Sequence, residues 1–239
     1  MRTKEEVESA SQGHTTVDFV QVDLTLISGM KTFVEEIETA VGPKGVNYLT
    51  ISRFYVAYHL TTRGLLAPGA PVLSVCGPGL TLDYLRVDDL NLAEQVESGI
   101  SKQSLFFAQS ARESCILDAV HMELNERFPQ YRYYHVAPVW LSWCPELRPQ
   151  GIVRTEGLAT FPAPFPINYL MKLGSFFIGT SPAEYAAYPV YAAVAGKDAL
   201  GEARFFDATL KEKEPGKWAS SEANRKALWK KLLDITADK

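Results

Sequence analysis

A cysteine and a histidine stand at the ends of two apolar runs that are typical of β-strands. Cys76 closes the run PVLSVC (71–76), and His135 lies near the end of YRYYHVA (131–137). A histidine titrates near neutral pH and can act as a general acid or base, and a cysteine thiolate is a nucleophile. The structural alternatives are a hydrogen-bonded core histidine and a buried cysteine that packs as a small apolar side chain, because the sequence places no basic partner close to Cys76.

Aromatic and hydroxyl side chains follow these two runs. Trp140 and Trp143 flank Ser142 in a stretch (140–168) that is rich in proline and aromatic residues. This composition predicts an apolar wall that holds a hydrophobic substrate, and the alternative is core packing or a dimer contact. Tyr84 follows the first run, where it either lines the same cleft or belongs to a surface turn.

Composition and charge exclude several classes of protein. The chain has 239 residues, a formal net charge of -4 and a pI near 5.7, which argues against nucleic-acid binding because such proteins carry a basic patch. The three cysteines form no CxxC pair and the four histidines are scattered, so we expect neither a metal site nor disulfides. The polar N-terminus is not a signal peptide, and no apolar run could span a bilayer. We therefore expect a cytoplasmic protein without membrane contact.

Apolar periodicity predicts the elements that position these residues. Strands are expected at 16–24 (ending at Asp23), 71–76, 131–137 and 204–208. Helices are expected at 26–41, 47–66, 103–128, 169–177, 182–195 and 220–235, and 88–97 reads as an acidic loop or short helix.

The order of these elements predicts an α/β fold. Strands separated by helices favour a parallel sheet with helices on both faces. We expect a single domain over 1–239, with a pocket-forming excursion at 140–195 and a C-terminal strand and helix at 205–239. Ligands in such folds bind beyond the carboxyl ends of the strands.

Several stretches, taken in order, resemble the short-chain dehydrogenase/reductase superfamily, and within it a fungal branch associated with secondary metabolism. FVQVDLT (19–25) is similar to the third strand of that family, and NYLTISRF (47–54) to the start of its fourth large helix. PVLSVCGPG (71–79) resembles the fifth strand with its serine-bearing turn, and HVAPVW (135–140) resembles the sixth. The resemblance implies a Rossmann-like fold.

The departures from the family pattern concern its cofactor and its chemistry. The sequence contains no GxxxGxG turn, which cradles the dinucleotide pyrophosphate, and it starts about where the third strand is expected. Compared with the family, the fourth strand with its loop is also missing before Asn47. The catalytic tyrosine and lysine fall near Phe106 and Ser110, yet no tyrosine lies between Tyr84 and Tyr131. Of the family's catalytic tetrad, only an asparagine, Asn47, is a candidate to remain.

These observations predict a truncated Rossmann-like enzyme that uses no cofactor and performs no redox step. The expected reaction is an isomerisation, cyclisation or dehydration of a hydrophobic natural-product intermediate. A homodimer that pairs the helices near 47–66 and 103–128 is expected. The alternatives are an NADPH-dependent short-chain reductase and a non-catalytic pseudoenzyme that binds a ligand or a partner. The catalytic candidates are His135, Asn47, Cys76 and Tyr84, and the pocket candidates are Phe106, Ser110, Trp140, Ser142 and Trp143.

Overall fold

The fold is an α/β layered structure built on a parallel sheet. A computed structural model describes residues 20–50, 53–79, 85–137, 181–202 and 204–237, and the single positions 9, 18, 169 and 173. Its four strands lie side by side in chain order, and every pairing is parallel. The strands are β1 (Leu49–Thr50), β2 (Pro71–Val75), β3 (Arg132–Val136) and β4 (Phe205–Phe206). The predicted α/β class and parallel sheet are thus confirmed.

The two central strands are buried on both faces. Four of the five residues of β2 and four of the five of β3 are buried, as expected for continuous apolar runs in a parallel sheet. Their register pairs Val72 with Tyr133 and Ser74 with His135. The predicted strands at 71–76 and 131–137 are confirmed, and the strand predicted at 204–208 is present as the two-residue β4.

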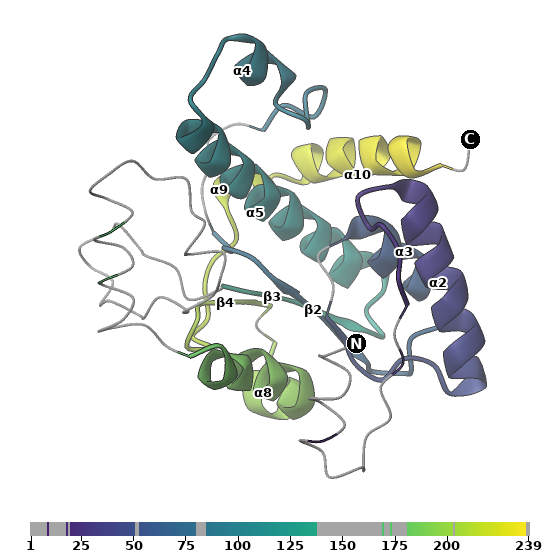
Figure 1. The fold of residues 1–239 in the computed structure, drawn as a ribbon. Helices are drawn as coiled ribbons and strands as arrows, with labels where there is room; N and C mark the ends of the chain where they lie inside the picture. The colour runs from purple at the N-terminus through teal and green to yellow at the C-terminus, as the bar shows by residue number, and fades with distance from the viewer. Residues whose placement is uncertain are drawn as a thin grey trace.

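Helices cover both faces of the sheet, as predicted (Figure 1). On one face, a core of side chains such as Val56, Leu60, Val72 and Tyr133 joins the sheet to its helices. On the other face, Ala192 packs against Leu73, Tyr134, Val136 and Phe206. The first face carries α2 (Ile27–Val41), α3 (Phe54–Thr62), α5 (Lys102–Arg127) and α10 (Glu222–Thr236), and the second carries α8 (Pro182–Leu200).

Most of the expected helices are present in the described residues. The helix predicted at 26–41 is α2, and it ends at Gly42, whose φ of 53° suits the left-handed region that glycine tolerates. The helix predicted at 103–128 is α5, whose N-cap Ser101 accepts a hydrogen bond from the Ser104 amide at 3.2 Å. The helix at 182–195 extends to Leu200 as α8. The last helix is divided into α9 (Lys217–Ser220) and α10, and the acidic stretch 88–97 holds α4 (Ala93–Glu97).

The strand predicted at 16–24 is wrong for the residues that the structure describes. Position 18 and residues 20–24 are not in a strand. The Asp23 carboxylate accepts hydrogen bonds from the Thr25 amide at 2.9 Å and from the Thr25 hydroxyl at 2.6 Å. These bonds form a local turn that leads the chain into α2, so Asp23 ends no strand here.

The helix predicted over 47–66 is also wrong in its first part. Leu49–Thr50 forms β1, which pairs with β2, and the helix that follows is the shorter α3. Val46 additionally bridges Leu66 in a parallel sense. Leu49 is buried in the core, whereas Tyr48 and Thr50 on either side of it are exposed, which is the alternation of a strand. A strand therefore occupies the place where the sequence suggested that one was missing.

Parts of the prediction lie outside the described residues. These are the aromatic stretch 140–168 and the helix predicted at 169–177, of which only positions 169 and 173 are described. Among the described helices, none combines the length and the apolar character that crossing a membrane requires.

Candidate functional site

Four side chains meet where the central strands end. Cys76 directly follows β2, and its amide donates a hydrogen bond to the Val136 carbonyl at 3.0 Å. His135 is the fourth residue of the neighbouring β3. Ser114 and Asp118 come from α5, which packs against β3. Two of the predicted site residues, Cys76 and His135, thus lie together at the carboxyl ends of the strands, beside two residues of a helix.

His135 and Asp118 form a fully buried pair. The Nδ1 atom of His135 lies 2.7 Å from Oδ1 of Asp118, and neither side chain is exposed. The second carboxylate oxygen of Asp118 accepts the backbone amides of Gly79 at 2.9 Å and of Gly216 at 2.8 Å. A buried carboxylate with three donors around it is well satisfied. Asp118 thus fixes the orientation of the imidazole ring.

The turn after Cys76 is held against a second loop through the same carboxylate. Gly79 has a φ of 72°, and a Cβ atom added there would lie 2.6 Å from the Glu214 carbonyl oxygen. Only glycine fits this close approach in the left-handed region. The backbone around Cys76 is therefore defined by Asp118 and by the loop that precedes α9.

Cys76 is half-buried, and its Sγ lies 3.2 Å from Oγ of Ser114. Burial alone raises the pKa of the Cys76 thiol, but the imidazole of His135 and the Ser114 hydroxyl together outweigh it, so that the pKa is lowered. Nε2 of His135 is buried without a hydrogen-bond partner of ordinary length and angle, although Cys76 interacts with the ring electrostatically. The thiol thus lies beside the imidazole without a hydrogen bond of ordinary geometry to Nε2.

The pKa of the His135 imidazole is shifted in the opposite direction, upward. Burial lowers the pKa of His135, but the hydrogen bond and charge of Asp118, assisted by Cys76, outweigh burial and raise it. A lowered thiol pKa beside a raised imidazole pKa favours a thiolate next to an imidazolium. The arrangement therefore favours the thiolate form of Cys76 beside a ring that Asp118 holds in place.

The neighbouring histidine and cysteine, His121 and Cys115, do not share the pKa shifts of His135 and Cys76. His121 stacks on His135 with ring centroids 5.5 Å apart, yet burial and the charge of His135 lower the pKa of His121 to about 3. Its Nδ1 lies 2.8 Å from the Leu117 carbonyl, so the ring is neutral with the proton on Nδ1. Burial and the charge of Asp118 raise the pKa of Cys115 to about 12. Cys115 is thus an unreactive core thiol.

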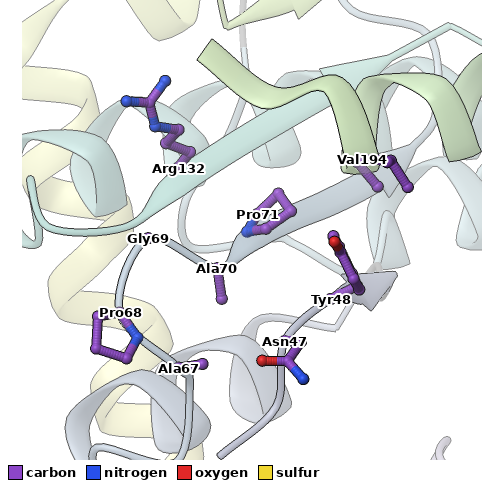
Figure 2. Close-up of a pocket in the computed structure, with 10 residues that line it drawn as sticks. Asn47, Tyr48, Ala67, Pro68, Gly69, Ala70, Pro71, Arg132 and Val194 are labelled. Carbon is purple, nitrogen blue, oxygen red and sulfur yellow. The ribbon is translucent and has the colours of Figure 1, made fainter. Parts of the chain in front are cut away.

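The structure brings together two of the predicted catalytic residues and separates a third. Cys76 and His135 lie in the cluster, whereas Asn47 precedes β1 and lines a cavity at the opposite ends of the strands (Figure 2). Ser110 lies one helical turn before Ser114 on α5. Tyr84, Trp140, Ser142 and Trp143 lie outside the described residues, as does the side chain of Phe106.

Asp118 and Ser114 are the site residues that the sequence analysis missed. They are four residues apart on a helix that was predicted correctly, so they share one face with Ser110. A row of polar residues at this spacing on the core side of a long helix was the available signal. Only the packing of α5 on β3 reveals that Asp118 faces His135.

Comparison with known proteins adds no assignment. A scan against protein-family models gives no match, and a search of curated proteins gives no similar sequence. Among the residues that the structure describes, no group of three histidine, cysteine or acidic side chains could hold a metal ion.

Proposed function

We propose that the protein is a cofactor-independent, non-redox enzyme in which the Cys76 thiolate is the group that acts on the substrate. The observation that carries the proposal is the difference in solvent exposure among the residues of the cluster. Cys76 is partly exposed, whereas His135 and Asp118 are completely buried behind it. A substrate beyond the strand ends can therefore touch Cys76 but not the imidazole. His135 and Asp118 are positioning residues, and Cys76 is the catalytic residue.

An accessible thiol in front of a buried imidazole favours proton transfer over acyl transfer. In acyl transfer by a cysteine, the histidine must also protonate the leaving group, which a buried ring cannot reach. A thiolate beside an imidazolium can instead remove a proton from a carbon next to a carbonyl, giving an enolate and a neutral thiol. Ser114, at hydrogen-bond distance from the sulfur, helps to orient it.

The three expected reactions share this first step. Return of the proton from the thiol to a different carbon moves a double bond, which is an isomerisation. Loss of a β-hydroxyl group, which leaves as water with that proton, is a dehydration. Attack of the enolate carbon on a second carbonyl of the same molecule, followed by protonation of the new alkoxide, is a cyclisation. Each step conserves electrons, so no redox cofactor is needed.

The residues of α5 support a non-redox reaction. A short-chain reductase needs a tyrosine and, four residues later, a lysine on this helix, whereas the face next to Cys76 carries Ser114 and Asp118. None of the 11 tyrosines is followed by lysine at that spacing. The hydrophobic character of the substrate rests on the aromatic stretch 140–168 and remains part of the proposal.

The test uses two probe ketones in D2O, with and without NADPH, and reads the products by mass. We expect a β,γ-unsaturated ketone to be isomerised with deuterium uptake, or a β-hydroxy ketone to lose water, in the absence of NADPH. Cys76→Ala should reduce the rate on the order of a hundredfold or more, because the base is removed. Cys115→Ala, which removes a buried thiol on α5 next to Ser114, is the matched control and should retain the rate.

Two outcomes would overturn the proposal. A product that gains two hydrogens only when NADPH is present would identify a short-chain reductase. Saturable binding of both ketones without turnover, and without deuterium exchange, would identify a ligand-binding pseudoenzyme.

A further inference from the structure

A cavity lies at the amino-terminal ends of the strands, away from Cys76. It has a volume of about 340 Å³. It is lined by Asn47 and Tyr48 before β1, residues 67–70 before β2, Pro71 and Arg132 at the starts of β2 and β3, and Ala193 and Val194 of α8 (Figure 2). Pro71, which lines the cavity, and Cys76 are five residues apart along the extended chain of β2, which at about 3.3 Å per residue is roughly 16 Å. The cavity is therefore distinct from the proposed active site.

One charged side chain, that of Arg132, lines the cavity, and it has no hydrogen-bond or ion-pair partner among the residues that the structure describes. Alternation along β3 places Arg132 on the face of α8, because Tyr133 and His135 bond to Thr61 and Asp118 on the other face. The Nη1 atom of Arg132 is buried and makes no hydrogen bond, and no ion pair of Arg132 occurs among the described residues. In Figure 2 the side chain rises from the start of β3 on the side of α8.

A buried guanidinium nitrogen without an acceptor is costly. Arg112 and Arg225 each bond to a carboxylate, although the Nε atom of Arg112 is also buried without a hydrogen bond. None of the cavity-lining residues is acidic. The missing acceptor is thus expected to come with a ligand.

The rest of the lining indicates the chemistry of that ligand. A guanidinium can donate two parallel hydrogen bonds to a carboxylate in a bidentate pair. The single positive charge of Arg132 balances the one negative charge of a carboxylate, but not the two of a phosphate group. The side chains of Pro68, Pro71 and Val194 offer apolar contact, and Asn47 and Tyr48 offer polar groups at the rim. The volume is near the lower limit for small-molecule pockets. We propose that this cavity binds a small monocarboxylic acid, with its carboxylate on Arg132 and its apolar body against Pro71 and Val194.

The proposal is tested by calorimetric titration of the full chain with acetate, hexanoate, benzoate and phenylacetate. At least one of the acids with an apolar body should bind saturably below about 10 mM, a weak-ligand range for a small molecule. Its neutral counterpart, hexanol, benzyl alcohol or phenylethanol, should bind at least tenfold more weakly. Inorganic phosphate should not compete.

Three variants locate the site. Arg132→Met should weaken carboxylate binding at least tenfold, and Val194→Trp should do the same by filling the cavity from an exposed position without removing charge. Arg53→Met changes an exposed arginine at the other end of β1 and should leave binding unchanged, as should Cys76→Ala. Circular dichroism checks that each variant folds.

The proposal is overturned if none of the four acids saturates, if the alcohols or phosphate bind as well as the acids, or if neither Arg132→Met nor Val194→Trp weakens binding. Because the readout is binding, it is independent of any turnover at Cys76.

Discussion

At the scale of single residues, the two described thiols differ by their surroundings. Cys76 and Cys115 are both at least partly buried, but Cys76 faces the imidazole of His135 whereas Cys115 lies in an apolar cluster with Ala119 and Leu228. Burial without a compensating charge raises a thiol pKa, and a neighbouring imidazolium lowers it. The same residue type is therefore reactive in one place and inert in the other.

We predict that Cys76 is alkylated at lower pH than an ordinary thiol, whose pKa is about 8.5. In a Cys144→Ala background, the rate of iodoacetamide modification of Cys76 should reach half of its maximum below that value, and Cys115 should remain unmodified in the folded protein. His135→Gln should move the midpoint for Cys76 upward, because the positive charge is lost. Peptide mass analysis after alkylation at each pH measures both rates. An unchanged midpoint in His135→Gln would show that the imidazole does not act on the thiol.

At the scale of elements, α5 carries the site and must be held in place. A network of charged side chains attaches α10 to its C-terminal half. Arg225, which is 5% exposed, bonds to Glu123 at 3.2 Å and to Glu126 at 2.7 Å. Arg127 also bonds to Glu123 at 2.7 Å and lies over the Trp229 ring at 4.6 Å. Because Glu123 is buried, these partners compensate its desolvation.

We predict that Arg225→Met destabilises the protein by about 3 kcal/mol, since removing one partner of a buried ion pair leaves a buried charge without full compensation. The value lies at the lower end of the usual range because Arg127 still bonds to Glu123. Urea unfolding at pH 7 measures the loss. Lys226→Met breaks the adjacent but exposed pair with Glu222 and serves as the control, with little change expected. Equal effects of the two substitutions would contradict this account.

At the scale of the whole molecule, the stability should respond to acid through His121. This ring is neutral in the folded protein, with a pKa lowered to about 3 by burial and by the charge of His135, whereas in the unfolded chain it titrates near 6.5. Above pH 6.5 the ring is neutral in both states. As the pH falls from 6.5 toward 3, only the unfolded chain gains the proton, so the folded state loses stability in this window.

Wild-type protein should therefore lose more stability between pH 7 and pH 4.5 than His121→Gln, by about 2 to 3 kcal/mol, because two pH units correspond to about 2.7 kcal/mol. Urea unfolding at both pH values gives the four free energies of unfolding. The difference between the two pH values is the readout, so a constant cost of the substitution cancels. Parallel losses in both proteins would show that His121 is not held neutral by the fold.

The predicted homodimer remains a prediction at this scale. Five of the nine residues of α3 are already buried within the chain, so a pairing through 47–66 would have to use the remaining positions of that segment together with α5.

The sequence by itself determined the elements whose patterns are strong. The apolar runs that became β2 and β3, and the helical spacing that became α2 and α5, were long enough to identify their type. The segment 47–66 was misassigned because a two-residue strand leaves too short a pattern to distinguish from the start of a helix, and its pairing with β2 supplies the energy that local propensity does not.

Only the tertiary structure decided the site. Cys76, Asp118 and His135 are separated by 42 and 17 residues along the chain, and no local pattern relates them. The parallel pairing of β2 with β3 places the cysteine beside the histidine, and the packing of α5 places the carboxylate behind it. The sequence supplied the reactive residue types, whereas the low-dielectric contact that shifts the pKa values of Cys76 and His135 exists only after these elements pack.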